Sequence, residues 1–358
     1  SLNYYRNSVV PLIEELSDDS FRESMLNNFL EQQLEKKLLL ADSVKNIRNP
    51  KTKDKYILQM LSSNDDLQKK EGIKAIQYIS DPNLKEFHAL NVLNNSRQVI
   101  KDYIVNYIDF ISDPNQKDSI IVKIANSKNE YNRLAAVKML NRISNPKLGE
   151  KVIWHLANDK HSFIKLNIIE LATKMLSEER RNELISKFAN DKDCVVRKTA
   201  VKNIDLVSDP KLRDTIILKL INDKDHYVRE SAIQNVKYLS NDDLKEKTIR
   251  KLMNSSDPQI RINAANSINF ISDPVERNSI IEKLCNSNDF LDNLTVINAI
   301  NHVSNPDLQE KIINQSLKSQ HTRRRNSEIT RYLIRHIDKI ANKMLVMKTF
   351  VKLTRQDN

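Results

Sequence analysis

Residues 209–239 have the sequence DPKLRDTIILKLINDKDHYVRESAIQNVKYL, and this stretch contains one complete structural unit. In its first half, apolar residues recur at helical spacing, at Leu212, Ile216, Ile217 and Leu220. Asp209 can cap a helix, and Pro210 can take the first helical position, where a missing N–H costs nothing. The stretch therefore predicts one helix over about 210–221 and a second over about 226–239.

Proline recurs along the chain with a regular spacing. Seven of the nine prolines share one register with a 32-residue period, at Pro50, Pro82, Pro114, Pro146, Pro210, Pro274 and Pro306. The sequence FISDP also occurs twice, at 110–114 and 270–274, which is five such periods apart. A period of this length indicates a solenoid of stacked repeats.

Apolar columns appear when the chain is aligned at this period. In the first predicted helix one column is apolar throughout, with Ile57, Ala89, Ile121, Ile153, Ile185, Ile217, Ile249, Ile281 and Ile313. In the second helix the corresponding column contains Ile76, Ile108, Leu140, Ala172, Ile204, Val236, Ile268 and Ile300. Each unit is therefore predicted to be a pair of amphipathic helices, A and B.

Three of the units share a recognisable motif. The segments DKDCVVRKTAVKNI (191–204), DKDHYVRESAIQNV (223–236) and SSDPQIRINAANSI (255–268) resemble the D-x-x-V-R-x-x-A signature of HEAT and HEAT-like repeats, the group that includes the bilin-lyase-type repeats. The resemblance implies an all-α fold, an α-α superhelix or HEAT-like solenoid of about nine 32-residue helix pairs. It further implies a right-handed superhelix with helices B on its concave surface, but no single function.

Three segments are expected along the chain. Residues 1–49 are expected to form degenerate or capping helices, residues 50–337 the repeat array, and residues 338–358 a basic capping helix. The formal net charge is +11, and residues 318–358 alone carry +8 of it. The protein is thus predicted to be nearly neutral with a basic end.

The composition argues against several other classes. Gly72 and Gly149 are the only glycines, which disfavours hairpin-rich β folds and glycine-rich phosphate loops. No run of 18 apolar residues and no leader-like segment is present, so neither a membrane span nor a signal peptide is expected. Cys194 and Cys285 are too few for a disulfide framework or a zinc site, and a reducing, cytoplasmic location is expected.

The solvent face of helix B is the predicted partner surface. Amides on such a face can bond the backbone of an extended peptide, while aromatic side chains supply contact area. The candidate residues are Tyr78, Tyr103, Asn106, Phe110, Asn141, Tyr238, Asn266, Asn269, Phe270, Asn298, Asn301 and His302. Two alternatives are that the asparagines reflect composition and that the aromatic column packs against the next repeat.

Two basic columns accompany this face. The column in helix B, which includes Arg197, Arg229 and Arg261, is interpreted as structural: together with the aspartate four residues before, it is expected to make capping and inter-repeat ion-pair contacts. The column in helix A contains candidate contacts for an anionic partner, as does the C-terminal arginine cluster: Lys187, Lys219, Lys251, Lys283, Arg323, Arg324, Arg331 and Arg335.

A non-enzymatic scaffold that binds an extended part of another protein is the function that these features favour. Mixed charge on the B face argues against the second hypothesis, sequence-tolerant nucleic-acid binding. A third hypothesis is a HEAT-like DNA glycosylase or lyase, although the single tryptophan, Trp154, is predicted on the outward face of a helix A. No catalytic residue, metal or cofactor is predicted, because the seven histidines show no ligand spacing.

Overall fold

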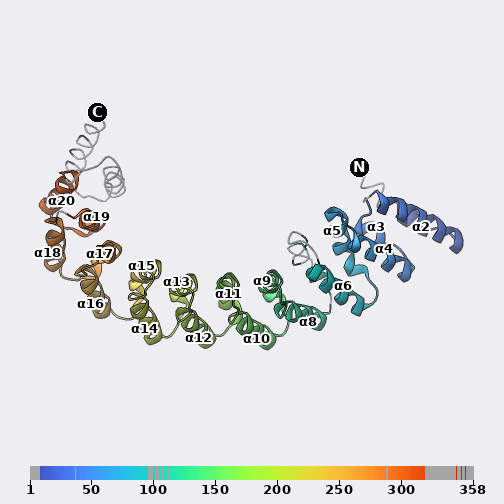
Figure 1. Cartoon of the computed structure of the whole chain (residues 1–358), viewed down its shortest axis with the longest axis horizontal. Helices are drawn as coiled ribbons and strands as arrows, with labels where there is room; N and C mark the ends of the chain where they lie inside the picture. The colour runs from blue at the N-terminus through green and yellow to red at the C-terminus, as the bar shows by residue number, and fades with distance from the viewer. Residues whose placement is uncertain are drawn as a thin grey trace. The chain divides into compact units, whose positions relative to one another are not determined.

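The computed structural model is helical, with no strand among the residues that it describes (Figure 1). These residues are 9–36, 38–95, 100, 103, 105, 108–111, 113–287, 289–318, 344, 348 and 351. The chain divides into two compact units, residues 1–176 and 177–358. The prediction of an all-α superhelix of helix pairs is confirmed.

In the first unit a helical segment at residues 9–14 precedes α2 (Asp19–Glu35) and α3 (Ala41–Lys45). Its A helices are α4 (Pro50–Ser62), α6 (Pro82–Asn95), α8 (Pro114–Ala125) and α10 (Pro146–Leu156). Its B helices include α5 (Asp66–Ala75), α9 (Glu130–Met139) and α11 (Ser162–Met175). Short 3-10 helices follow helix B at η1 (Ile76–Tyr78), η2 (Ile108–Phe110) and η3 (Leu140–Arg142).

The second unit repeats the same plan. Its A helices are α12 (Glu178–Ala189), α14 (Pro210–Leu220), α16 (Asp242–Met253), α18 (Pro274–Cys285) and α20 (Pro306–Lys318). Its B helices are α13 (Cys194–Lys202), α15 (His226–Gln234), α17 (Pro258–Ala265) and α19 (Phe290–Ala299). The 3-10 helices are η4 (Ile204–Leu206), η5 (Val236–Tyr238), η6 (Ile268–Phe270) and η7 (Ile300–His302).

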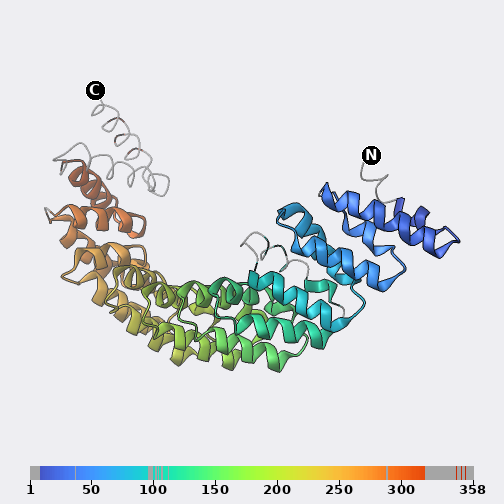
Figure 2. The same cartoon turned by 45° about the vertical axis from the view of Figure 1, so that its right-hand side comes forward.

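Within the second unit the helices form two rows that follow the order of the sequence (Figure 2). The A row contains α12, α14, α16 and α18, and the B row contains α13, α15, α17 and α19. Neighbouring B helices contact one another along the row, and the B row lies on the inner side of this unit's curve (Figure 1). The B helices of this unit therefore lie on its concave side, where the HEAT-like resemblance placed them.

Aspartate or asparagine caps most of the helices, and the aspartate caps are those that the sequence predicts. Asp209 accepts hydrogen bonds from the backbone N–H groups of residues 211 and 212, and Pro210 is the first residue of α14. Asp225 caps α15 in the same way, accepting from Tyr227 N at 3.0 Å. These bonds satisfy donors that a helix leaves free at its start.

Helix B ends earlier than the sequence predicts. The expected helix over 226–239 stops at Gln234, Asn235 is its C-cap, and the 3-10 helix η5 replaces the final turn. Leu239 then adopts an extended conformation while its N–H bonds to the Val236 carbonyl at 3.0 Å. The reason is that a tighter 3-10 turn still buries Val236 and Leu239, so both apolar columns are kept while the chain turns toward the next helix A.

The core consists of the predicted columns. Ile217, Ile249 and Ile281 of the A helices are fully buried, as are Ile204, Val236 and Ile268 at the starts of the 3-10 helices. Burying a side chain of this size contributes about 1.5–3 kcal/mol. Because each repeat contributes the same set, the core continues from repeat to repeat within a unit.

The loop that leads to the next helix A is held by side chains of the preceding helix A. Asp214 accepts a hydrogen bond from Ser240 N at 2.8 Å, and Asp118 accepts from Ser144 N at 2.8 Å. From the neighbouring position in α14, Arg213 donates to the carbonyl oxygens of Val207 (3.0 Å) and Tyr238 (2.8 Å). These bonds satisfy loop backbone groups on both sides of a helix A.

The structure places α2 and α3 in the segment 1–49, for which capping or degenerate helices are predicted. The hydroxyl of Tyr56, buried in α4, lies 3.0 Å from Asn27 Oδ1 of α2. Contacts of this kind join α2 to the first helix pair. The boundary near residue 337 lies outside the described residues and remains a prediction.

The two glycines give a matched test of packing. A Cβ added to Gly72 would lie 2.9 Å from the backbone N of Leu61 in α4. A Cβ added to Gly149 would lie 2.8 Å from the flexible Met175 Cε and at ordinary contact distance, 3.7 Å or more, from Ile143. We expect Gly72→Ala to lower the free energy of unfolding by about 1–3 kcal/mol, because backbone cannot move aside.

Urea unfolding followed by circular dichroism measures the effect. The control is Gly149→Ala, which should be neutral or slightly stabilising, since the Met175 side chain can rotate and alanine favours a helix. Equal destabilisation by both substitutions would contradict the assignment of close backbone packing to Gly72.

Candidate functional site

The predicted aromatic column lies in the 3-10 turns, not on helix B. Tyr78, Tyr238, Phe270 and His302 are the last residues of η1, η5, η6 and η7, and each is half-buried. Phe110 ends η2, but its side chain lies outside the described part of the chain. The expected position on the helix B surface is wrong, because helix B has already ended where these residues occur.

Lysines lie close to two of these rings. Lys237 Nζ is 5.0 Å from the centroid of the Tyr238 ring, and Lys245 Nζ of α16 is 5.6 Å from that of Phe270. At Tyr78, burial and the charge of Asp42 raise the pKa of the phenol. The rings are thus partly packed at the edge of the core, with a cation near two of them.

The predicted asparagines fall into different environments. Asn141, Asn266 and Asn269 are exposed, while Asn301 is half-buried. Asn298 is only 6% exposed, so its expected exposure is wrong. The reason is that α19 is buried at every position from Asp292 to Ala299. Asn106 lies outside the described residues.

Tyr103 is half-buried beside the B helix α5, with Lys70 Nζ 5.6 Å from its ring centroid. It lines a cavity of about 350 Å³ together with Leu67, Lys70 and Lys74. A hydrogen bond from Lys74 to Glu71, at 2.6 Å, raises the pKa of the ammonium group. This part of the first unit therefore combines an apolar surface with paired charges.

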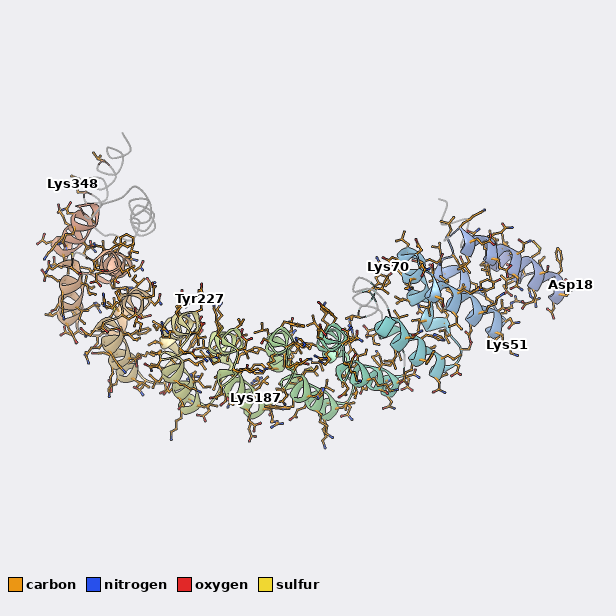
Figure 3. The ribbon with its side chains drawn as sticks, viewed as in Figure 1. Asp18, Lys51, Lys70, Lys187, Tyr227 and Lys348 are labelled. Carbon is orange, nitrogen blue, oxygen red and sulfur yellow. The ribbon has the colours of Figure 1, made fainter. Side chains whose placement is uncertain are left out.

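An exposed apolar column at the start of helix B was missed in the sequence. Leu67 and Tyr131 in the first unit are 71% and 50% exposed, and Val195 and Tyr227 in the second unit are 48% and 54% exposed. All four occupy the second position of a B helix and share one column of the repeat alignment. Figure 3 shows Tyr227 on the B row of the second unit.

The 32-residue alignment contains the signal for this column. Phe163 and Leu291, which occupy the same position in two other repeats, are also apolar and are half-buried. Gln259 interrupts the column in the second unit. Side chains that are exposed in successive repeats are not explained by core packing, and a regular row of them marks a candidate contact surface.

The predicted basic column of helix A is exposed. Lys187, Lys219, Lys251 and Lys283 lie on α12, α14, α16 and α18, and Figure 3 shows Lys187 on the A row. Lys219 hydrogen-bonds to Asn190. The other four anionic-partner candidates, Arg323, Arg324, Arg331 and Arg335, lie outside the described residues.

The structural interpretation of Arg197, with an ion pair between repeats and an aspartate cap, is confirmed. Arg197 of α13 forms a two-bond pair with Asp223, 26 residues later, with Nε–Oδ2 and Nη2–Oδ1 distances of 2.7 and 2.8 Å. Asp193, the aspartate four residues before, instead caps the helix by accepting from Val195 N at 2.8 Å. The arginine therefore joins neighbouring repeats.

This ion pair shifts the pKa values of both Arg197 and Asp223. The hydrogen bond to Asp223 raises the pKa of Arg197. Burial alone would raise the pKa of Asp223, but hydrogen bonds from Arg197 and from the N–H of Asp225 outweigh burial and lower it. Arg133 and Asp159 form the corresponding pair in the first unit, and the pKa of Asp159 is lowered for the same reasons.

A cavity of about 560 Å³ lies between successive repeats of the second unit. Its lining includes Leu218 of α14, Leu244 and Lys251 of α16, Ser255, and Ile260 of α17.

Over the described residues, no group of three or more His, Cys, Asp or Glu side chains could hold a metal. Among the same described residues, no helix is long and apolar enough to cross a membrane.

No protein-family model and no curated protein matches the chain. Among solved structures, the karyopherin Kap121p bound to the extreme C-terminus of the protein phosphatase Cdc14p is similar, with a TM-score of 0.51 and 11% identity. The match covers 98% of this chain and 45% of Kap121p. An engineered protein, at a TM-score of 0.37 and 14% identity, matches over 98% of both chains. The chain has the fold of a HEAT-like solenoid.

Acid should lower the stability of the folded second unit, because it protonates the Asp223 carboxylate. We expect Asp223→Asn to lower the free energy of unfolding by about 3 kcal/mol at pH 7, because it leaves the buried Arg197 without its carboxylate. The pKa of Asp223 is lower in the folded chain than its ordinary value of 3.8. The stabilisation that the Asp223 carboxylate gives to the folded chain is therefore complete above pH 3.8, and it is lost as the pH falls through the folded pKa.

Denaturant unfolding at pH 7 and across pH 2–5 measures both effects. The wild type should lose stability on acidification below pH 4 more steeply than Asp223→Asn. Asp209→Asn is the matched control, because Asp209 is an exposed cap and asparagine caps equally well. A control variant as unstable as Asp223→Asn would contradict the special role of the ion pair.

Proposed function

We propose that this chain is a protein-binding scaffold that holds an extended segment of its partner along the B helices. The exposed apolar column at the start of helix B carries the proposal. Val195 and Tyr227 present apolar surface at the same position of successive repeats in the second unit, and Lys198 Nζ lies 5.1 Å from the Tyr227 ring centroid. Exposed aromatic and apolar side chains with nearby cations are typical of protein contact surfaces.

The repeat spacing favours an extended partner. Packed helices lie about 8–10 Å apart, so the column offers one apolar contact at about this interval. An extended chain in the polyproline II conformation advances about 3.1 Å per residue and has three residues per turn. Every third side chain of such a segment would meet one repeat.

Amide groups supply the second part of the surface. Asn263 of α17, Asn266, which caps the end of α17, and Asn269 of η6 make no side-chain hydrogen bond to any residue that the structure describes. Asn266 and Asn269 are exposed. Their amides can donate to and accept from the backbone of a bound segment, while Tyr238 and Phe270 supply aromatic contact area beside them.

The first unit contains an internal example of this recognition. Leu39 lies between α2 and α3, and the buried Gln68 of the B helix α5 holds its backbone. Gln68 Nε2 donates to the Leu39 carbonyl at 2.8 Å, and Gln68 Oε1 accepts from Leu39 N at 3.2 Å. One side-chain amide on a B helix thus pairs with both backbone groups of a non-helical residue.

A peptide selection tests the apolar column. We expect the full chain to enrich, from a displayed library of random linear peptides, sequences with an apolar residue at every third position. The double variant Val195→Ser and Tyr227→Ser should bind a selected peptide at least about 10-fold more weakly, because two apolar contacts are removed. Fluorescence anisotropy with the labelled peptide gives the affinity.

Val275→Ser is the matched control, because Val275 is 74% exposed but lies on the A helix α18. It should leave peptide affinity unchanged. A peptide that binds the double variant as tightly as the wild type, or a selection that enriches nothing, would count against the proposed surface.

The aromatic residues make a separate prediction. The double variant Tyr238→Ala and Phe270→Ala should bind the same peptide about 10-fold more weakly, while its far-ultraviolet circular dichroism spectrum stays that of the wild type. Leu206→Ala is the control, because Leu206 occupies the same position in η4 without an aromatic ring. Unchanged affinity in the double variant would remove Tyr238 and Phe270 from the partner surface.

A further inference from the structure

The arginines of helix B contact the preceding loop in one repeated way. Nη1 donates to the backbone carbonyls six and five residues earlier. The two distances are 2.9 and 3.0 Å for Arg197, 2.9 and 3.1 Å for Arg229, and 2.8 and 3.1 Å for Arg133. Arg261 makes the first of these bonds at 2.6 Å. The loop therefore fixes the guanidinium group before it meets any anion.

The other edge of the guanidinium group, formed by Nε and Nη2, holds a carboxylate in three repeats. The pairs are Arg133 with Asp159, Arg197 with Asp223, and Arg261 with Asp292. In each pair both nitrogens donate, and all three arginines are buried. Two N–H groups side by side suit a carboxylate, so this edge selects that group.

Arg229 is the exception, because Ser255 stands 26 residues after it in place of an aspartate. Ser255 Oγ accepts from Asp257 N at 3.2 Å. Asp223 makes the same loop bond one repeat earlier, where its Oδ1 accepts from Asp225 N at 2.9 Å. The serine thus keeps the loop bond but supplies no negative charge. Nothing in the described part of the chain forms a hydrogen bond or ion pair with Nε or Nη2 of Arg229.

The unpaired edge of Arg229 is open to solvent. Arg229 is half-buried, whereas the three paired arginines are buried. Neither Nε nor Nη2 of Arg229 is buried, although both lack a partner among the described residues. A carboxylate from outside the chain can therefore replace water at this edge without breaking a bond within the protein.

The exposed apolar column changes at the same junction between repeats. Val195 and Tyr227 are followed in this column by Gln259, the second residue of α17. Gln259 is exposed, and its side chain makes no hydrogen bond to a described residue. The junction therefore presents a polar group where the two preceding repeats present apolar ones.

The repeat geometry places the unpaired edge beside this part of the column. The edge of Arg197 meets Asp223, which lies in the loop just before α15 and its exposed Tyr227. Because the loop bonds hold Arg229 in the same way, its edge is directed toward the loop just before α17, the helix of Gln259. A segment that follows the column from one repeat to the next meets the unpaired edge at this junction.

We propose that the Nε–Nη2 edge of Arg229 binds the carboxylate of an acidic side chain in the partner segment. The carboxylate accepts from both nitrogens, as Asp223 does from Arg197. The segment therefore combines apolar residues for Val195 and Tyr227 with a glutamate or aspartate for Arg229. This inference rests on the proposed scaffold function, because it identifies one residue of the bound segment.

Nuclear magnetic resonance of the arginine Nε–Hε groups tests this contact on the full chain, with the peptide acetyl-Leu-Glu-Leu-amide as the probe. We expect the Arg229 signal, identified by its loss in Arg229→Gln, to shift and saturate at millimolar peptide. The Arg197 signal should stay in place, because its Nε already donates to Asp223. An Arg229 signal that does not move up to about 20 mM peptide, well above a millimolar dissociation constant, would overturn the proposal.

The matched control peptide is acetyl-Leu-Gln-Leu-amide, which has the same shape without the charge. It should bind at least about 10-fold more weakly, because a guanidinium group bonds more strongly to a carboxylate than to a neutral amide. Equal affinity for the two peptides would contradict a carboxylate site.

A carboxylate supplied by the chain itself should compete with the peptide. Ser255→Asp places an aspartate where it can pair with Arg229, and it should reduce the affinity for the glutamate peptide at least about 10-fold. Ser287→Asp, at the equivalent position one repeat later, should leave this affinity unchanged, because Arg261 is already paired with Asp292. Wild-type affinity in folded Ser255→Asp would refute the site.

Arg229→Lys separates the shape of the edge from its charge. Lysine keeps the positive charge but has no pair of side-by-side donors, so the glutamate peptide should bind at least about 10-fold more weakly. The signals of the peptide measure this affinity, since the variant has no Nε–Hε group at position 229. A lysine variant that binds as tightly as the wild type would contradict the two-nitrogen contact.

The acidic contact and the scaffold function fail separately. The displayed library tests the apolar column, whereas the short glutamate peptide tests Arg229 alone. If selected peptides depend on Val195 and Tyr227 but the Arg229 signal responds neither to them nor to the glutamate peptide, the scaffold function stands and the acidic contact is refuted. If the Arg229 signal responds to the glutamate peptide and the library enriches nothing, the carboxylate contact stands and the bound segment along the column is refuted.

Discussion

The loops between repeats must satisfy their backbone hydrogen-bonding groups without a sheet or a long helix to do so, and the rest of the structure depends on this constraint. Asp209 satisfies the first N–H groups of α14, while Asp214 reaches from that helix to the N–H of Ser240. Arg213 of the same helix donates hydrogen bonds to one backbone carbonyl before α14 and to one after it. With the loops fixed in this way, the apolar columns of one repeat meet those of the next.

The regular repeat period predicted the core and the helix pairs because burial depends on the same positions in each repeat. It could not predict where helix B ends, since Val236 and Leu239 are equally apolar in an α turn and in a 3-10 turn. The aromatic residues Tyr238 and Phe270 were therefore placed on the wrong element. Asn298 has the spacing of Asn266 but is buried, because the packing around α19 is not visible in one column.

The candidate surfaces were predicted less well than the fold. Val195 and Val196 are adjacent and identical, and only the phase of the helix decides that Val196 is buried while Val195 is 48% exposed. An ion pair between repeats was expected for Arg197, but its partner Asp223 was not identified, because the nearest aspartate in the sequence, Asp193, caps the helix and the paired aspartate lies 26 residues later. Contacts between repeats follow from the loop geometry, which a residue pattern alone does not contain.

The serine at position 255 has a consequence for how the second unit unfolds. In a repeat protein, cooperativity depends on the coupling between neighbouring repeats, since each repeat contacts only its neighbours. The arginine-to-aspartate pair couples the repeat of α13 to that of α15, and a similar pair couples α17 to α19. Between α15 and α17 this pair is absent from the described contacts. Local opening of the second unit is therefore expected to begin at this junction, which would divide the unit into two cooperative blocks.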